Sequence, residues 1–280
     1  MKNKTPLISV IMAAYNSEKY IAEAIESVLK QTFNNFELII INDASADKTL
    51  DIIKEYAEKD KRIKLINHKQ NKGISETRND GIKEAKGKYI AIHDSDDISK
   101  PERFKLQADY LKSHPKCGVV GSHIEIFDDT IKKIVSLRKY PEKDSDLRKM
   151  IFFSCPIAQP VSMIRAEVFK KLGLYDKRYP PTEDLDLWFR IGTLYEFASI
   201  PKVLLVYRYY PNSSSWGKIR TTERLSNLIR WRNWNNKSYH FGLKEFFYNF
   251  FHLISIYTIP SKFKVWLFAK IRDKKIVEVK

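Results

Sequence analysis

The sequence has few cysteines and lacks an apolar run long enough to cross a bilayer. Cys117 and Cys155 are too few for a disulfide framework in 280 residues, and they show no paired metal-ligand spacing. The longest apolar candidate, residues 246–259, is interrupted by polar side chains. The apolar run 7–14 is too short for a signal peptide and leads into no cleavage site. We therefore expect a cytoplasmic protein whose chain begins with a buried strand.

Glycine is also scarce, with nine residues, and no glycine-rich phosphate loop follows the first apolar run. That position holds the sequence AAYN at 13–16. Residues 81–88 approximate a P-loop, but the spacing of the glycines is wrong and Tyr89 stands where Ser or Thr should be. These absences argue against a nucleotidyltransferase. A phosphatase with Asp94 as nucleophile is a weaker alternative, because that nucleophile should end an early strand.

Short apolar runs alternate with helical patterns in the first hundred residues. Residues 7–14 and 36–42 have the composition of buried strands, and residues 18–31 between them place apolar side chains on one helical face. The alternation continues with helices expected at 47–58 and 74–86 and strands at 63–67 and 88–94. It predicts a doubly wound α/β sheet, Rossmann-like and mostly parallel, with ligands at the carboxyl ends of the strands.

The rest of the chain is less regular. We expect helices at 101–113, 166–172 and 183–192 and strands at 117–128 and 203–209. Residues 129–165 are less regular, with loops expected around residues 140–141 and 156–160. A hydrophobic content of 43% in 280 residues fits one catalytic domain with an appendage. We divide the chain into a catalytic domain at 1–215, with a donor half at 1–99 and an acceptor half at 100–215, and a helical extension at 216–280.

The net charge of +16 is concentrated in the extension, where residues 217–280 hold fourteen Lys and Arg against four Asp and Glu. Basic residues alternate there with aromatic ones, which is typical of a segment that contacts an anionic membrane surface. The alternatives are packing on the catalytic domain or a homodimer contact. Single-stranded nucleic acid could use the same side chains, but the catalytic motifs give that partner no support. The aromatic residues are Trp234, Tyr239, Phe241, Phe246, Phe247, Tyr248, Phe250, Phe251, Tyr257, Phe263 and Trp266.

Two acidic clusters follow predicted strands. Residues 94–97 read Asp-Ser-Asp-Asp, and three carboxylates so close repel one another unless a cation lies among them. A solvated acidic turn is the commoner explanation of such a pattern. In the second cluster, Asp43 could accept hydrogen bonds from a base or ribose, and Asp47 could cap the next helix. Both clusters lie at strand ends, so we expect them at one edge of the sheet.

Two further positions carry charged groups at predicted helix starts. Arg78 could hold a diphosphate, although an ordinary surface arginine is the alternative. Glu183 and Asp184 open another helix, where acidic residues are favourable for capping and dipole reasons alone. One of them could instead remove a proton from an acceptor hydroxyl. Spacing alone does not decide between these alternatives.

Taken in order, the motifs resemble one enzyme family. The chain closely resembles the family 2 glycosyltransferases, which have the GT-A fold, over roughly residues 6–215. The resemblance rests on ISVIMAAYN, QTFNNFELIIINDASADKT, NKGISETRN, GKYIAIHDSDD, CPIAQPVSMIRAEVF and EDLDLWFR, at family-like intervals. One such motif would be weak evidence, whereas the ordered set is specific.

The resemblance implies a role for each candidate residue. Tyr15 and Asp43 would hold the nucleoside, most simply that of UDP, and Arg78 would approach the base or diphosphate. Asp96 would be the principal ligand of Mn²⁺ or Mg²⁺, with Asp94 beside it. In the acceptor site, Asp184 would be the general base and Glu183 its neighbour. The remaining residues implied to bind the donor are Ala13, Ala14, Asn16, Glu18 and Ser95.

The sequence departs from the family's usual pattern at a few positions. Alanine replaces proline at Ala13 and glycine at Ala44, and asparagine replaces aspartate at Asn42. Gln159 stands where many relatives have histidine, which puts acceptor or phosphate contacts in doubt. The implied function is inverting transfer from a UDP-sugar to a saccharide hydroxyl. The acceptor would be lipid-linked, at the inner face of a bacterial membrane during surface-polysaccharide synthesis. A sugar-nucleotide binder without activity is the alternative from another class.

Overall fold

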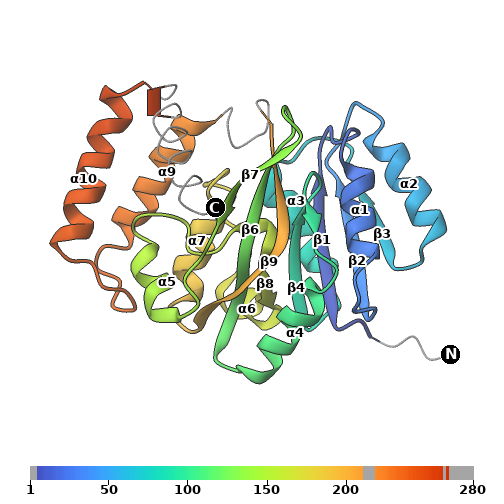
Figure 1. Ribbon diagram of the computed structural model, residues 1–280, viewed down its shortest axis with the longest axis horizontal. Helices are drawn as coiled ribbons and strands as arrows, with labels where there is room; N and C mark the ends of the chain where they lie inside the picture. The colour runs from blue at the N-terminus through green and yellow to red at the C-terminus, as the bar shows by residue number, and fades with distance from the viewer. Residues whose placement is uncertain (1–4, 211–217, 261–262, 265–280) are drawn as a thin grey trace.

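The computed structural model describes residues 5–210, 218–260 and 263–264, and it consists of one mixed sheet covered by helices (Figure 1). The strand order is β3-β2-β1-β4-β8-β6-β9-β5, and β7 pairs with β6 outside this path. The expected division between a catalytic domain and an extension falls at residues 215 and 216, which lie outside the described residues.

The first half of the sheet is the predicted parallel unit. Strands β1 (Ile8–Ala14), β2 (Phe36–Asn42), β3 (Ile63–Asn67) and β4 (Tyr89–Asp94) run parallel in the order β3-β2-β1-β4. The connecting helices are α1 (Ile21–Leu29), α2 (Thr49–Lys59) and α3 (Ile74–Glu84). These strands and helices confirm the predicted alternation. The helix expected from residue 18 begins only at Ile21, because the backbone amides of Ser17 and Glu18 donate to side chains at the start of α2 and in the loop before it.

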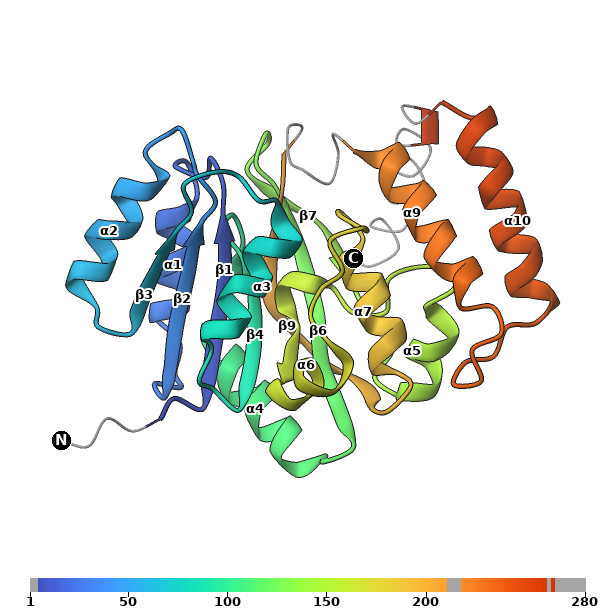
Figure 2. The same ribbon diagram turned by 180° about the vertical axis from the view of Figure 1, so that it is seen from behind.

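Alternate residues of the central strands face two separate hydrophobic layers, as the two-residue period of a strand requires. Ile8, Val10 and Met12 of β1 pack with α1, α2 and α4 (Arg103–Ser113) on one face. Ile11 of β1 packs instead on the other face, which α3, α6 (Ala166–Leu172) and α7 (Glu183–Ile191) cover (Figure 2). Burial on both faces explains why these strands are apolar along nearly their whole length.

The second half of the sheet is mixed. The long strands β6 (Cys117–Asp128) and β9 (Glu196–Tyr209) are parallel to each other. Strand β8 (Met163–Arg165) runs antiparallel between β4 and β6, and β5 (Ile98–Ser99) pairs antiparallel with β9. The loops expected around residues 140–141 and 156–160 are present, except that the short helix η1 (Gln159–Val161) takes in the end of the second one. The same segment also forms β7 (Lys133–Arg138) and α5 (Asp144–Met150), which were not predicted.

The described part of the extension contains α9 (Ile219–Arg232) and α10 (Leu243–Thr258), at the end of the molecule opposite β3 (Figures 1 and 2). Ile229 and Tyr239 belong to the same buried cluster as Trp188 of α7, and the Tyr239 hydroxyl donates to the Trp188 carbonyl at 3.0 Å. Phe241 packs edge-on against Phe152 at 4.9 Å between ring centroids. Part of the aromatic tail therefore packs on the catalytic domain, and Trp266 lies outside the described residues. Across the described ranges, no helix is long and apolar enough to cross a membrane.

Candidate active site

The predicted site residues come together at the carboxyl ends of β1, β2 and β4. In the register of the sheet, Ala14 lies opposite Asn42 on one side, and Ala13 lies opposite Asp94 on the other. Because these strands are parallel and in adjacent positions, the loops that follow them share one edge. The expectation that both acidic clusters lie at this edge is confirmed.

Asn16 and Glu18 join the loops that follow β1 and β2. The side-chain oxygen of Asn16 accepts a hydrogen bond from the backbone of Ala46 at 2.9 Å. In the same way, the carboxylate of Glu18 accepts one from the backbone of Lys48 at 2.9 Å. Asn16 adopts a left-handed conformation with φ of 49°, which asparagine tolerates better than most residues. The two side chains therefore shape the rim of the edge. Contact between them and a donor stays a prediction.

Tyr15 stands out from this rim. Its side chain is 53% exposed, whereas the adjacent Ala13 and Ala14 are buried in β1. An exposed aromatic ring above a strand end is available to stack on a nucleobase. The two alanines can contribute little beyond their backbone and a small apolar surface.

Asp43 holds the loop that leads into α3. Its carboxylate accepts hydrogen bonds from the backbone amides of Lys72 at 2.9 Å and Gly73 at 3.0 Å, and it lies 2.8 Å from Nδ1 of His68. Burial favours the protonated acid, but these hydrogen bonds prevail and lower the pKa of Asp43. Asp43 is thus a fixed negative charge that is only 3% exposed. Its predicted contact with the base would add to this structural role.

The loop after β4 carries three carboxylates in different environments. Asp94 accepts a hydrogen bond from Arg78 at 2.7 Å, and Asp96 accepts one from the Tyr210 hydroxyl at 2.9 Å. Desolvation and the negative charge of Asp94 raise the pKa of Asp96 to about 6. Asp97 is buried, and one of its oxygens has no hydrogen-bond partner. Between Asp94 and Asp96, Ser95 is buried and its hydroxyl lies 2.8 Å from that of Ser17 in the first loop.

This loop fits a divalent cation that arrives together with a phosphate ligand. No three acidic, imidazole or thiol groups within the described residues form a complete metal-binding cluster. Arg78 occupies one oxygen of Asp94 and Tyr210 occupies one oxygen of Asp96, so each carboxylate keeps a second oxygen. Mg²⁺ is commonly held by one or two carboxylates plus substrate phosphates and water. Desolvation and the charge of Asp94 raise the pKa of Asp96, and a nearby cation would offset both effects.

Arg208 of β9 holds the acidic loop in place. Its Nε donates to the carbonyl of Asp96 at 2.9 Å, and its backbone amide donates to the carboxylate of Asp97 at 2.9 Å. The guanidinium is paired with buried Asp129 at 2.9 Å. Sequence reasoning missed Arg208, Asp129 and Tyr210. The available signal was Arg208 itself, because it is the only charged residue in the predicted strand 203–209.

Arg78 connects the acidic loop with α7. Its two terminal nitrogens donate to Asp94 at 2.7 Å and to Glu183 at 2.6 Å. Arg78 is 6% exposed, which excludes the alternative of an ordinary surface arginine. Residues that are 16 and 105 positions away in the sequence therefore meet at one guanidinium. Its predicted contact with the base or diphosphate stays a prediction.

Glu183 and Asp184 start α7 in environments that favour their protonated forms. Burial raises the pKa of Glu183 to about 7, since it outweighs the opposing effect of Arg78, and the nearby charge of Asp184 adds to the rise. Desolvation also raises the pKa of Asp184. One oxygen of Asp184 accepts from the backbone of Leu185 at 2.8 Å, and the other lies 3.4 Å from the thiol of Cys155. A carboxylate with a raised pKa is suited to accept a proton near neutral pH.

Gln159 and Tyr175 form a buried pair beside these acids. The side-chain amide of Gln159 donates to the Tyr175 hydroxyl at 2.6 Å, and its carbonyl oxygen has no partner. The negative charges of Glu183 and Asp184 help to raise the pKa of Tyr175, after the larger effect of burial. Gln159, which stands where the family resemblance implies histidine, thus keeps a buried side-chain oxygen without a partner among the described residues. Tyr175 was not predicted, and no motif marks it.

Replacing Tyr175 by phenylalanine is expected to destabilise the protein by about 1–3 kcal/mol, because the buried amide of Gln159 loses its partner. Urea unfolding followed by circular dichroism measures the change. Tyr15→Phe is the matched control, since that side chain is 53% exposed and its loss of a hydroxyl should leave the midpoint unchanged. An equal midpoint for Tyr175→Phe and the wild type would contradict the importance of the pair.

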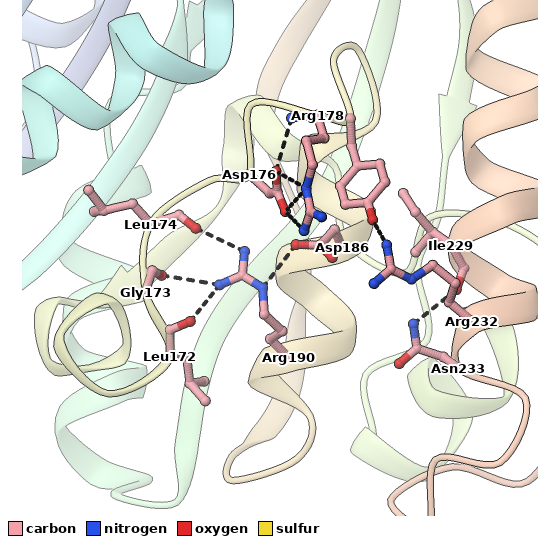
Figure 3. A pocket seen from close by; sticks show the side chains of 11 residues that line it. Leu172, Gly173, Leu174, Asp176, Arg178, Asp186, Arg190, Ile229, Arg232 and Asn233 are labelled. Atoms are coloured by element: carbon pink, nitrogen blue, oxygen red, sulfur yellow. Dashed lines mark hydrogen bonds and ion pairs between the residues drawn. The ribbon is translucent and has the colours of Figure 1, made fainter.

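A cavity of about 520 Å³ lies on another side of α7, between α6 and α9 (Figure 3). Four of its charged groups form two pairs: Arg190 binds Asp186 at 2.9 Å, and Arg178 binds Asp176 at 2.5 Å. Arg232 donates instead to the Tyr179 hydroxyl. None of the predicted donor-binding or catalytic residues lines this cavity. The candidate active site is therefore the strand edge and not this hollow.

A parallel β3-β2-β1-β4 unit that ends in an acidic loop, with a second acidic pair on a later helix, defines a glycosyltransferase of the GT-A fold. The chain belongs to glycosyl transferase family 2, because residues 9–173 match the model of that family. It is 33% identical over 277 residues to an uncharacterized glycosyltransferase of Methanocaldococcus jannaschii, covering 96% of this chain and 95% of that protein.

Solved structures share the fold. TarS of Staphylococcus aureus, crystallised as residues 1–349 in complex with UDP, has a TM-score of 0.60 and 24% identity. That similarity covers 79% of this chain and 64% of the crystallised one, so this chain spans somewhat less than two thirds of it. A mannosyltransferase of Pyrobaculum calidifontis in complex with GDP-mannose and Mn²⁺ has a TM-score of 0.64 and 15% identity, covering 91% of this chain and 70% of that one. Identities this low support the fold and no more.

Proposed function

We propose that the protein transfers a sugar from a UDP-sugar to a hydroxyl of a saccharide acceptor, with inversion at the anomeric carbon and with Mn²⁺ or Mg²⁺ as cofactor. The observation that carries the proposal is the position of Arg78. This residue bridges Asp94 in the acidic loop and Glu183 beside Asp184. The groups proposed for the donor and those proposed for the acceptor therefore face one another across a single side chain.

The donor side is supported by the first two loops of the sheet edge. Tyr15 would stack on the nucleobase and Asp43 would accept hydrogen bonds from it, beside the rim that Asn16 and Glu18 form. Asp96 and Asp94 would hold the cation through their remaining oxygens. A bound cation would stabilise the negative charge that develops on the leaving diphosphate. TarS was crystallised with UDP, and the mannosyltransferase with GDP-mannose and Mn²⁺, so both relatives of this fold bind nucleotides.

The acceptor side supplies the base. Asp184 would remove the hydroxyl proton while the acceptor oxygen forms a bond to the anomeric carbon from the face opposite the diphosphate. The bond between the anomeric carbon and the phosphate oxygen breaks, and its electron pair leaves with the nucleoside diphosphate. The proton remains on Asp184 until it passes to solvent. Retention would instead require a carboxylate nucleophile beneath the anomeric carbon, and the family resemblance favours inversion.

For the acceptor itself, we propose a lipid-linked saccharide at the cytoplasmic face of the membrane, as in surface-polysaccharide synthesis. Residues 217–280 carry fourteen basic against four acidic residues, which favours contact with anionic lipid. A homodimer through the extension is the alternative use of the same surface. In either case, soluble saccharides would be poorer acceptors than the natural one, because binding of remote groups contributes to the rate.

A sugar-nucleotide binder without catalytic activity is the second candidate from a different class. It is favoured by the hydrogen bond between Tyr210 and Asp96, which occupies one oxygen of the proposed cation ligand. Hydrolysis or transfer of the donor discriminates between the two. The assay offers UDP-, GDP- and dTDP-sugars to the purified protein with Mn²⁺ or Mg²⁺ and follows release of the nucleoside diphosphate. Lack of release from every donor, even with lipid acceptors in detergent, would overturn the enzymatic proposal.

Asp96→Asn is expected to lower metal-dependent release of the nucleoside diphosphate by at least about 100-fold, since it removes the negative charge of the principal cation ligand. The amide keeps the size of the side chain, so the fold should be retained. Asp109→Asn is the matched control, because that carboxylate lies on the exposed part of α4 and pairs only with Lys105. Unchanged release by Asp96→Asn at every metal concentration would contradict the assignment.

A further inference from the structure

Helix α10 is amphipathic in the reverse of the usual sense. The residues that it buries against the protein include Glu245 and Asn249. The exposed residues are almost all large and apolar, with Leu243 78% exposed, Phe251 61% and Tyr257 62%. A surface helix of a globular protein normally turns its apolar face inward. The exposed face of α10 therefore requires an explanation outside the packing of this domain.

The orientation of α10 is fixed by hydrogen bonds of its polar face. The side-chain amide of Asn249 donates to the carbonyl of Phe152 at 3.1 Å, and the backbone carbonyl of Asn249 accepts from the side chain of Asn227 in α9 at 2.9 Å. Glu245 caps the start of the helix by accepting from the backbone of Gly242 at 2.9 Å. Rotating the helix to bury its aromatic residues would break these contacts and expose Asn249, which is fully buried. The apolar face consequently belongs on the outside.

We use the term outer face for the exposed apolar side of α10, which consists of Leu243, Phe246, Phe247, Phe250, Phe251, Leu253, Ile254 and Tyr257. At about 100° per residue, these side chains cover an arc of about 160°. A two-stranded coiled coil needs only a narrow seam of two positions in seven. A helix that lies in a bilayer interface has a broad apolar face with several aromatic residues. The width and the composition of the outer face thus favour a lipid surface over a second copy of the chain.

We infer that the outer face of α10 docks on an anionic bilayer, with the helix axis in the plane of the interface. The inference deepens the proposed lipid-linked acceptor, on which it rests. Charge complementarity supports it: Arg220 of α9 lies over the ring of Tyr257 at 5.7 Å, and Lys244 flanks the start of the outer face. Residues 261–280 add seven Lys and Arg against two Asp and Glu. Basic residues beside an interfacial helix strengthen its attraction to anionic lipid.

Helix α10 is the outermost helix at its end of the molecule in both views (Figures 1 and 2). No part of the sheet lies beyond it in either view. A planar surface can therefore approach the outer face without first meeting the catalytic domain. Docking there would hold the enzyme at the surface that carries its proposed acceptor.

The test is co-sedimentation of the full chain with vesicles of phosphatidylglycerol and of phosphatidylcholine. The double variant Phe247→Ser/Phe251→Ser removes two rings that are 51% and 61% exposed. We expect the wild type to sediment with phosphatidylglycerol vesicles and the double variant to show at least about tenfold weaker partitioning, since each ring contributes to apolar burial. Leu194→Ser is the matched control, because that side chain is 61% exposed in the turn between α7 and β9. It should sediment as the wild type does.

Two further measurements keep the result interpretable. The melting temperature of the double variant should equal that of the wild type, which separates lost docking from lost folding. Release of nucleoside diphosphate in the absence of vesicles should also be unchanged in the double variant. This assay tests the proposed glycosyl transfer independently of membrane docking, so the two proposals can fail separately. Equal sedimentation of the double variant and the wild type, or absence of wild-type binding to phosphatidylglycerol, would overturn the inference. A wild-type dimer that the double variant dissociates, in place of vesicle binding, would assign the outer face to self-association.

Discussion

Asp184→Asn is expected to lower sugar transfer by about 10²–10⁴-fold while leaving donor binding within a few-fold of the wild type. The factor is the usual contribution of a general base. Asparagine keeps the hydrogen bond that Leu185 donates to the Oδ1 position, so α7 should begin at the same residue. The variant loses the carboxylate that accepts the proton. Asp184 lies on the acceptor side, so the groups proposed to bind the donor are unchanged. Transfer to acceptor and calorimetric binding of UDP measure the two effects separately.

The control for this variant is Asp186→Asn on the same helix. Asp186 pairs with Arg190 at 2.9 Å and lines the cavity on another side of α7. The same substitution there should leave transfer nearly unchanged. The pH profile adds a second criterion. Desolvation raises the pKa of Asp184, so its protonated, inactive form accumulates at a higher pH than for an ordinary aspartate, whose pKa is about 3.9. Wild-type activity should therefore begin to fall at a higher pH than that value as the solution is acidified. If Asp184→Asn transfers sugar at the wild-type rate, the base is another group.

The strands that could be predicted from the sequence are those that are buried on both faces of the sheet. Strands β1 and β2 are covered on both faces, so their sequences read as apolar runs with helical patterns between them. Strand β7 escaped prediction because it lies outside the main path of the sheet and is largely exposed, which leaves its alternation weak. Only the second part of β9 was predicted. Pro201 interrupts this strand where its pairing with β6 shifts register, and proline within a run argues against a strand.

The site was predictable where a general rule of the fold applies. Parallel strands bring their carboxyl ends to one edge, so the proximity of Ala13, Asn42 and Asp94 followed from the strand assignments. Contacts between distant segments do not follow from any such rule. The pairing of Arg208 with Asp129 depends on how β9 passes the acidic loop, and neither residue lies in a recognisable motif.

The same limit applies to α10. Its sequence shows an apolar and a polar face, and the usual rule would have buried the apolar one. The structure buries Asn249 instead, because its side-chain amide donates to the carbonyls of Phe152 and Glu245, and Asn227 of α9 donates to its backbone carbonyl. Which face of an amphipathic helix turns inward depends on partners elsewhere in the chain, and these become known only with the tertiary structure.

Arg78→Leu is expected to destabilise the protein by about 3–5 kcal/mol, the usual cost of removing one partner from a buried ion pair. Glu183 is 3% exposed, so its carboxylate would lose the cation without gaining water, whereas Asp94 is partly exposed and loses less. Urea unfolding measures the loss. Arg178→Leu is the control, because Arg178 is exposed and pairs with Asp176 at the surface, so its removal should leave the stability nearly unchanged.

The pH dependence of the Arg78→Leu effect gives the sharper test. Burial raises the pKa of Glu183 to about 7 in the folded protein, above its ordinary value of about 4.3, so its charged form lowers stability as the pH rises through this interval. Arg78 reduces that penalty, and without it the penalty grows. The deficit of Arg78→Leu should therefore be larger at pH 8 than at pH 5, where Glu183 is mostly protonated in both proteins. In the double variant Arg78→Leu/Glu183→Leu this pH dependence should largely disappear, because the group that titrates has been removed. An equal loss of stability at pH 5 and pH 8 would show that the ion pair with Glu183 is not the interaction through which Arg78 stabilises the protein.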